Sequence, residues 1–193
     1  ASIGHALGHP LYRLFSLVPN WEYGLSDYEV TQHTHGHRLL AGRRAVHLTD
    51  LHIDRYGSHH DRVVQIVGDL QPDWIMITGD LLNVPEGLPH LFRFLGRLRA
   101  IAPTYMTLGN HDHYSGVSVT EYAELADRYK ITLLVNQSAV VSVAGGELVI
   151  VGVDDPSLHR ADLRCLPTRA DHRFTLLLAH APNILDQVEP HHA

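Results

Sequence analysis

The sequence predicts an α/β fold in which buried strands alternate with amphipathic helices. Short apolar runs predict strands at residues 45–49, 73–78 and 104–108. Two stretches with apolar residues at helical spacing, 62–70 and 88–100, separate these strands. Strands that alternate with helices of this length form right-handed βαβ units, so a mostly parallel sheet is expected.

The pattern changes after a third helix, which is expected near residues 119–129. Residues 138–143 and 147–153 flank an Ala-Gly-Gly stretch and are predicted to form a β-hairpin. Residues 174–179 form a further apolar run, which predicts a buried strand that ends just before His180.

Composition places the chain among ordinary soluble domains. Its 193 residues, 45% hydrophobic and 19% charged, are enough to bury a core. Without a linker or an internal repeat, we predict a lead-in segment at 1–44 and one domain at 45–193. The apolar run at 11–18 is too short to span a bilayer. The single Cys165 cannot form an internal disulfide, which permits a reducing compartment.

Polar side chains gather at the predicted carboxyl ends of the strands, where open α/β sheets bind ligands. These residues are Asp50, His52, Asp80, Asn110, His111, Asp112 and His180. Each one alone has a structural explanation as a turn former, a helix cap or a solvated loop residue. Together, at successive strand ends, they favour a metal site. Asp50 and His52 would point to the same side if the strand conformation continued through them.

The residue types indicate which metals would bind. Carboxylate and amide oxygens with neutral imidazoles suit Mn²⁺, Fe or Zn²⁺, and the lone Cys165 excludes a thiolate site. Two metals about 3.5–4 Å apart require a bridging carboxylate and can activate a hydroxide for attack on phosphorus. Asp80, behind Gly79, is the natural bridge.

At these residues the sequence resembles the calcineurin-like metallophosphoesterase superfamily. The matching segments are Leu48-Thr49-Asp50-Leu51-His52, Ile77-Thr78-Gly79-Asp80-Leu81, Leu108-Gly109-Asn110-His111-Asp112 and Leu178-Ala179-His180-Ala181-Pro182. The resemblance implies a layered α/β fold of the α/β/β/α type. It also implies that Asp50 and His52 bind a first metal, that Asp80 bridges, and that Asn110 and His180 bind a second. His111 would contact the phosphate and protonate the leaving oxygen, with Asp112 orienting it.

The chain departs from this family at its end. Family members carry a final Gly-His-x-His motif that gives one imidazole to each metal, and the chain stops at Ala193 without it. We therefore expect a domain truncated at its C-terminus, which binds metal weakly. An alternative is that His33 and His35 supply these imidazoles from the other end, as in a circular permutation.

The expected function is hydrolysis of phosphomonoesters or phosphodiesters by a hydroxide that two divalent metal ions activate. The expected substrate is a small-molecule phosphate ester or a lipid-linked one. The alternative is a metal-binding or regulatory module without turnover. A nuclease comes third, because a net charge of −6 provides no basic surface for nucleic acid. The segments 107–116 and 151–155 are most similar to a bacterial branch with membrane-associated members, which allows a cytoplasmic or a peripheral membrane location.

Overall fold

The computed structural model describes residues 30–34, 37–168, 171 and 173–192. The chain divides into two compact units, Ala1–His35 and Gly36–Ala193, and every described helix and strand belongs to the second unit. Of the two histidines in the permutation alternative, His33 is exposed and His35 lies outside the described residues.

The first sheet, called sheet A here, contains four parallel strands in the order β1-β2-β3-β4. Its strands are β1 (Ala45–Leu48), β2 (Trp74–Thr78), β3 (Thr104–Thr107) and β4 (Thr132–Leu133). The helices that connect them are α2 (Ser58–Leu70), α3 (Leu88–Ile101) and α5 (Val119–Tyr129). The predicted βαβ units are confirmed, although α2 begins before the predicted residue 62.

The second sheet, called sheet B, contains three strands in the order β5-β6-β7. These are β5 (Gln137–Val143), β6 (Gly146–Gly152) and β7 (Phe174–Leu178). The predicted hairpin is confirmed, since β5 and β6 are antiparallel, and β7 pairs in parallel with β6. The remaining elements are η2 (Arg38–Leu40), η3 (Pro85–Gly87), α4 (Asn110–Tyr114), η4 (Leu163–Cys165), η5 (Pro182–Ile184) and α6 (Leu185–His192). Neither α4 nor β4 was predicted.

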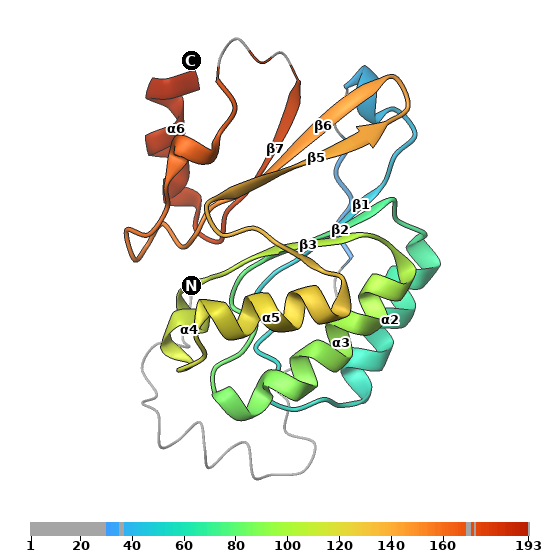
Figure 1. Cartoon of the computed structure of the whole chain (residues 1–193). Coiled ribbons are helices and arrows are strands. Elements are labelled where there is room, and N and C mark those ends of the chain that lie inside the picture. The colour runs from blue at the N-terminus through green and yellow to red at the C-terminus, as the bar shows by residue number, and fades with distance from the viewer. Residues whose placement is uncertain (1–29, 35–36, 169–170, 172, 193) are drawn as a thin grey trace. The chain divides into compact units, whose positions relative to one another are not determined.

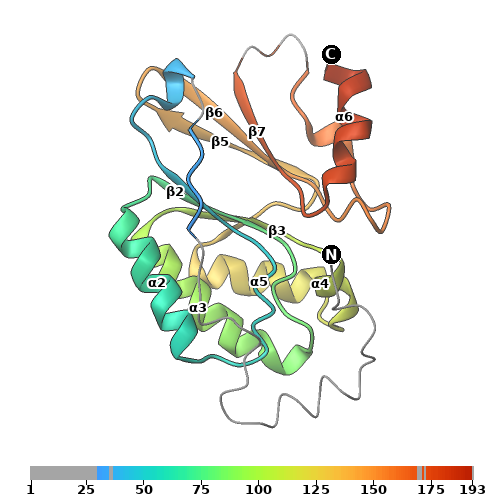
Figure 2. The ribbon, with the colours of Figure 1, turned by 180° about the vertical axis from the view of Figure 1, so that it is seen from behind.

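Sheet A is buried on both faces, because it lies between a helical layer and sheet B (Figures 1 and 2). Successive residues of β2 point to opposite faces. Ile75 and Ile77 pack in one apolar cluster with residues of α2, α3 and α5. Trp74 and Met76 pack on the other face in a second cluster that includes Ile150 of β6. The unbroken apolar run of β2 is thus explained by the two layers that cover it.

The longest described helix is α3, with 14 residues. A helix needs about 20 mostly apolar residues to cross a bilayer. In keeping with this, the described residues contain no helix that could span a membrane.

A buried histidine caps the first turn of α2, directly after the loop that carries Asp50 and His52. The backbone N–H of Gly57 donates to Nδ1 of His60 at 3.0 Å, and the ring packs between Tyr56 and Phe94. His60 is 6% exposed, and its Nε2 lies 3.1 Å from Nε2 of His59. Burial, followed by the neighbouring His59, lowers the pKa of His60 to about 4.

We expect this histidine to make the fold acid-sensitive. Between about pH 6.5 and pH 4, the unfolded chain binds a proton at His60 that the folded chain does not, so the free energy of unfolding falls as the pH falls through this range. The full loss is about 3 kcal/mol. Urea unfolding of the wild type and of His60→Gln at both ends of this range measures it. The His60→Gln variant should lose clearly less stability in acid, whereas His33→Gln, at an exposed position, should behave like the wild type.

Candidate active site

Five of the seven predicted site residues meet at one edge, because the strands that precede them end there. Two groups of three side chains each bring their ligand atoms within 4.8 Å of one another. One group is His52, Asp80 and His111, and the other is Asp50, Asp80 and His180. Asn110 is the first residue of α4, next to His111. The structure therefore joins ends of β1, β2 and β3 of sheet A with the end of β7 of sheet B.

Three of these residues have left-handed backbone conformations. The φ angles are 53° for Asp50, 43° for His52 and 53° for Asp80. Such angles cost about 1–3 kcal/mol each for residues with a side chain, and they gather at functional sites. The strand conformation does not continue through Asp50, since β1 ends at Leu48. Asp50 and His52 accordingly reach different groups, contrary to the simple alternation of a strand.

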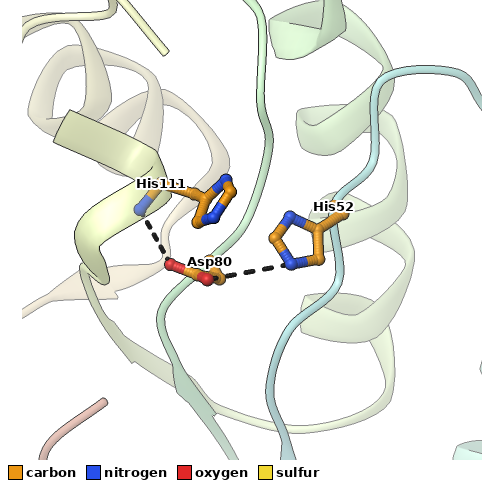
Figure 3. Close-up of side chains that lie close together, drawn as sticks. All are labelled: His52, Asp80 and His111. Carbon is orange, nitrogen blue, oxygen red and sulfur yellow. Dashed lines mark hydrogen bonds and ion pairs between the residues drawn. The ribbon is translucent and has the colours of Figure 1, made fainter. Parts of the chain in front are cut away.

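Asp80 is the residue that both groups share, and its two oxygens face different histidines. Its Oδ1 lies 3.4 Å from Nε2 of His180, and its Oδ2 lies 3.7 Å from Nε2 of His52. Oδ1 also accepts a hydrogen bond of 2.9 Å from the backbone N–H of His111 (Figure 3). The Asp80 side chain is 6% exposed, and its ion pairs within the described part of the chain involve only histidines. A buried carboxylate with such partners suits a bound cation.

One amide side chain orients two of the histidines. The Oδ1 atom of Asn83 lies 2.9 Å from Nδ1 of His52 and 2.8 Å from Nδ1 of His111. The Nδ2 group of Asn83 donates to Oδ2 of Asp54 at 3.0 Å, which decides that its oxygen and not its nitrogen faces the rings. Because that oxygen can only accept, both histidines carry a proton on Nδ1. Their Nε2 atoms are left to bind a metal or exchange a proton.

His180 is oriented in the same way by the backbone. Its Nδ1 donates to the carbonyl oxygen of Thr78, the last residue of β2, at 2.8 Å. Its Nε2 is therefore the ring nitrogen that faces Asp80. This hydrogen bond ties the end of sheet B to the end of sheet A at the site.

Two glycines allow the loops that carry Asp80 and His111 to touch. A Cβ on Gly79, whose φ is +79°, would lie 2.5 Å from the backbone nitrogen of Gly109. A Cβ on Gly109 would lie 2.4 Å from Oδ1 of Asp80. Any larger residue at either position would displace the shared carboxylate or the start of α4.

A comparison with known proteins identifies the family of the chain. The family model of the calcineurin-like phosphoesterases matches residues 43–193. The chain belongs to the calcineurin-like phosphoesterase family. Its mixed α/β fold, with a parallel sheet and covering helices, is consistent with that of the family.

Three bacterial relatives illustrate this membership. The uncharacterized metallophosphoesterases YkoQ and YkuE of Bacillus subtilis are 27% and 29% identical to the chain, over 76% and 87% of its length. Phosphodiesterase YaeI of Escherichia coli is 28% identical over 70% of it. The chain spans 56% of YkoQ, 64% of YkuE and 52% of YaeI.

In this phosphoesterase domain, Asp112 does not hold the orienting position predicted for it. Its carboxylate is fully buried and accepts hydrogen bonds from the backbone N–H groups of Leu81 and Gly109, at 2.9 and 2.8 Å. The hydroxyl of Tyr122 donates to it as well, at 3.2 Å. Asp112 thus joins the loop after β2 to the start of α4. The group that bonds to Nδ1 of His111 is Asn83, which the sequence analysis did not single out.

A weak signal for Asn83 was present in the sequence. It follows Asp80 within the same strand-end loop, and its short polar side chain resembles the others in the cluster. Nothing in the sequence shows that the loop bends so that Asn83 meets two histidines from other strands. Its backbone N–H and its amide both bond to Asp54, which is part of the loop after β1.

A buried pair of side chains also holds α4 in place. Nε2 of His113, on α4, lies 2.6 Å from Oδ1 of Asp154, which follows β6. The two side chains are 10% and 7% exposed. The pair fastens α4, which carries Asn110 and His111, to the end of sheet B.

We expect Asp112 to act on stability. Replacement by alanine would leave two buried backbone N–H groups and the Tyr122 hydroxyl without their acceptor. Asp112→Ala should lower the free energy of unfolding at neutral pH by about 3 kcal/mol or more, since each buried unsatisfied group costs about 1–3 kcal/mol. The gain from removing a buried charge offsets part of this loss, because burial raises the pKa of Asp112 to about 6. Urea unfolding at neutral pH measures the change.

The control is Asp127→Ala, because the Asp127 side chain is 88% exposed. Its free energy of unfolding should stay near that of the wild type. Unchanged stability of Asp112→Ala would contradict the linking role.

Proposed function

We propose that this domain hydrolyses phosphomonoesters or phosphodiesters at a centre of two divalent metal ions. The observation that carries the proposal is the position of Asp80, a buried carboxylate shared by two donor groups. A carboxylate with each oxygen directed at a different group suits a bridge between two cations.

The ligands that we propose are Asp50, His52, Asp80, Asn110 and His180. Oxygen and imidazole donors of this kind suit Mn²⁺, Fe or Zn²⁺. The bound ions would polarise the phosphoryl group and activate a water for attack on phosphorus. The protein contributes by holding these donors in place: Asn83 and the carbonyl of Thr78 fix the ring orientation of His52 and His180.

We propose that His111 donates a proton to the leaving oxygen. Its Nδ1 proton is held by Asn83 at 2.8 Å, so the proton that is exchanged belongs to Nε2. The ring of His111 lies 4.9 Å from that of His52, centroid to centroid. A phosphate bound beside His52 and Asp80 would therefore have its leaving group on the His111 side.

The substrate class rests on charge and on similarity. The net charge of −6 favours a small phosphate ester, or one linked to a lipid, over nucleic acid. The similarity to a protein named a phosphodiesterase supports a diester among the substrates. A peripheral location at a membrane stays a prediction.

The second candidate is a metal-binding module without turnover. It is supported by the size of the donor groups, because each holds three candidate His or Asp ligands among the described residues. Hydrolysis of bis(p-nitrophenyl) phosphate by the purified chain with added Mn²⁺ would establish the enzyme. Two tightly bound metal equivalents without hydrolysis would favour the module, and a chain that binds no metal would contradict both.

Because Asp80 is shared by both donor groups, its replacement should weaken metal binding at both sites. Asp80→Asn removes the charge that both donor groups share, so metal content should fall at both sites while the circular dichroism spectrum is retained. Elemental analysis after dialysis measures the metal. The matched control is Asp127→Asn, which removes an exposed carboxylate and should leave the metal content unchanged. Two full equivalents retained by Asp80→Asn would exclude the bridging role.

The proposed acid predicts a dependence on the leaving group. His111→Ala should lower the turnover of an alkyl phosphodiester at least ten-fold more than that of a nitrophenyl diester, because a good leaving group needs little protonation. Metal content should be retained, which separates an acid from a ligand. Equal losses on both substrates, with metal lost, would assign His111 to the metal group that its geometry also allows.

A further inference from the structure

An exposed aromatic ring lies beside the proposed acid. Tyr114 is the last residue of α4 and is 66% exposed, more than the other large apolar side chains exposed in the described part of the chain. It follows His111 by three positions, so the two side chains project from neighbouring positions of the same helix. Their rings make an edge contact, with centroids 6.1 Å apart and planes at 68°.

The ring of Tyr114 lies where the leaving group of a substrate is expected. If His111 protonates the leaving oxygen, as the proposed function requires, the group attached to that oxygen must lie on the His111 side of the phosphate. Tyr114 is the aromatic residue of α4 whose ring contacts the ring of His111. Its exposed ring is available to a bound molecule because no described packing covers it.

The segments on either side of Tyr114 and Asn83 offer no partner to a negatively charged ligand. The two segments that carry Asp80, Asn83 and His111 contain no lysine or arginine at residues 79–92 or 108–127. Two residues after Tyr114, Gly116 offers no side chain and lies next to Pro85, whose Cγ is 3.5 Å from the position of a Cβ on that glycine. These segments hold no lysine or arginine that could bind a second phosphate or a carboxylate.

We propose that Tyr114 is a platform for the leaving group of the substrate, and that this group is a flat ring without negative charge. Aromatic rings bind one another in stacked or edge-to-face arrangements, which a tyrosine anchored at a helix end can offer at small entropic cost. Stacking on one aromatic residue changes affinity by about ten-fold or more on alanine substitution. This inference rests on the proposed function, because the leaving group is expected beside Tyr114 only if His111 is the acid that protonates it.

Binding of two phosphonates to the zinc-loaded chain tests the proposal without turnover. Phenylphosphonate and methylphosphonate share the phosphonate group, but the first carries a phenyl ring on phosphorus and the second a methyl group. Calorimetry gives the affinity of each. The wild type should bind phenylphosphonate about ten-fold more tightly. Tyr114→Ala should lose this preference while keeping its affinity for methylphosphonate, and Tyr114→Phe should retain it. The matched control is Tyr129→Ala, which removes a partly exposed tyrosine of α5 that packs on Phe92.

Each other outcome overturns the inference in a distinguishable way. A wild type that binds both phosphonates equally would leave the phosphate site intact and remove the ring platform. A Tyr114→Ala variant that keeps the preference would place the ring elsewhere, and one that loses both affinities equally would give Tyr114 a structural role. A zinc-loaded wild type that binds neither phosphonate would overturn the proposed function together with this inference.

Discussion

The burial of one carboxylate, that of Asp80, is the constraint on which the site depends. Among the described residues, Asp80 has no lysine or arginine partner, and such a buried negative charge is costly unless cations or imidazoles surround it. The chain meets this requirement by bringing His52 and His180 to its two oxygens. The same carboxylate accepts the backbone N–H of His111, so it also fixes the start of α4.

The two sheets have to be held together for this arrangement to exist. Asp80 and His111 follow strands of sheet A, whereas His180 follows β7 of sheet B. Three hydrogen bonds between described residues join the sheets at this edge: His180 to the carbonyl of Thr78, His113 to Asp154, and the hydroxyl of Thr107 to the carbonyl of Val153. The apolar cluster around Met76 and Ile150 supplies the packing between them. The geometry of the site is therefore a property of the whole second unit.

Most of the fold could be predicted from hydrophobic periodicity. The third helix begins and ends where it was expected, at Val119 and Tyr129, and the strands before Asp50, Asp80 and His180 are present. Strand β4 was missed because two residues give no periodic signal, and α4 because its residues are polar and typical of turns. The start of α2 was placed too late, since its first turn is polar and is capped by His60 through a backbone contact.

The sequence by itself determined which chemistry is present, because residue types at successive strand ends specify oxygen and imidazole donors. Only the tertiary structure decided how these donors are shared and oriented. Left-handed backbone angles at Asp50 and His52 direct them to different groups, which a strand pattern cannot show. Asn83, and not Asp112, bonds to His111, because the loops after β1, β2 and β3 approach one another closely enough for Asp54 to fix its amide. Contacts of this kind depend on residues far apart in the chain, and local sequence patterns carry no information about them.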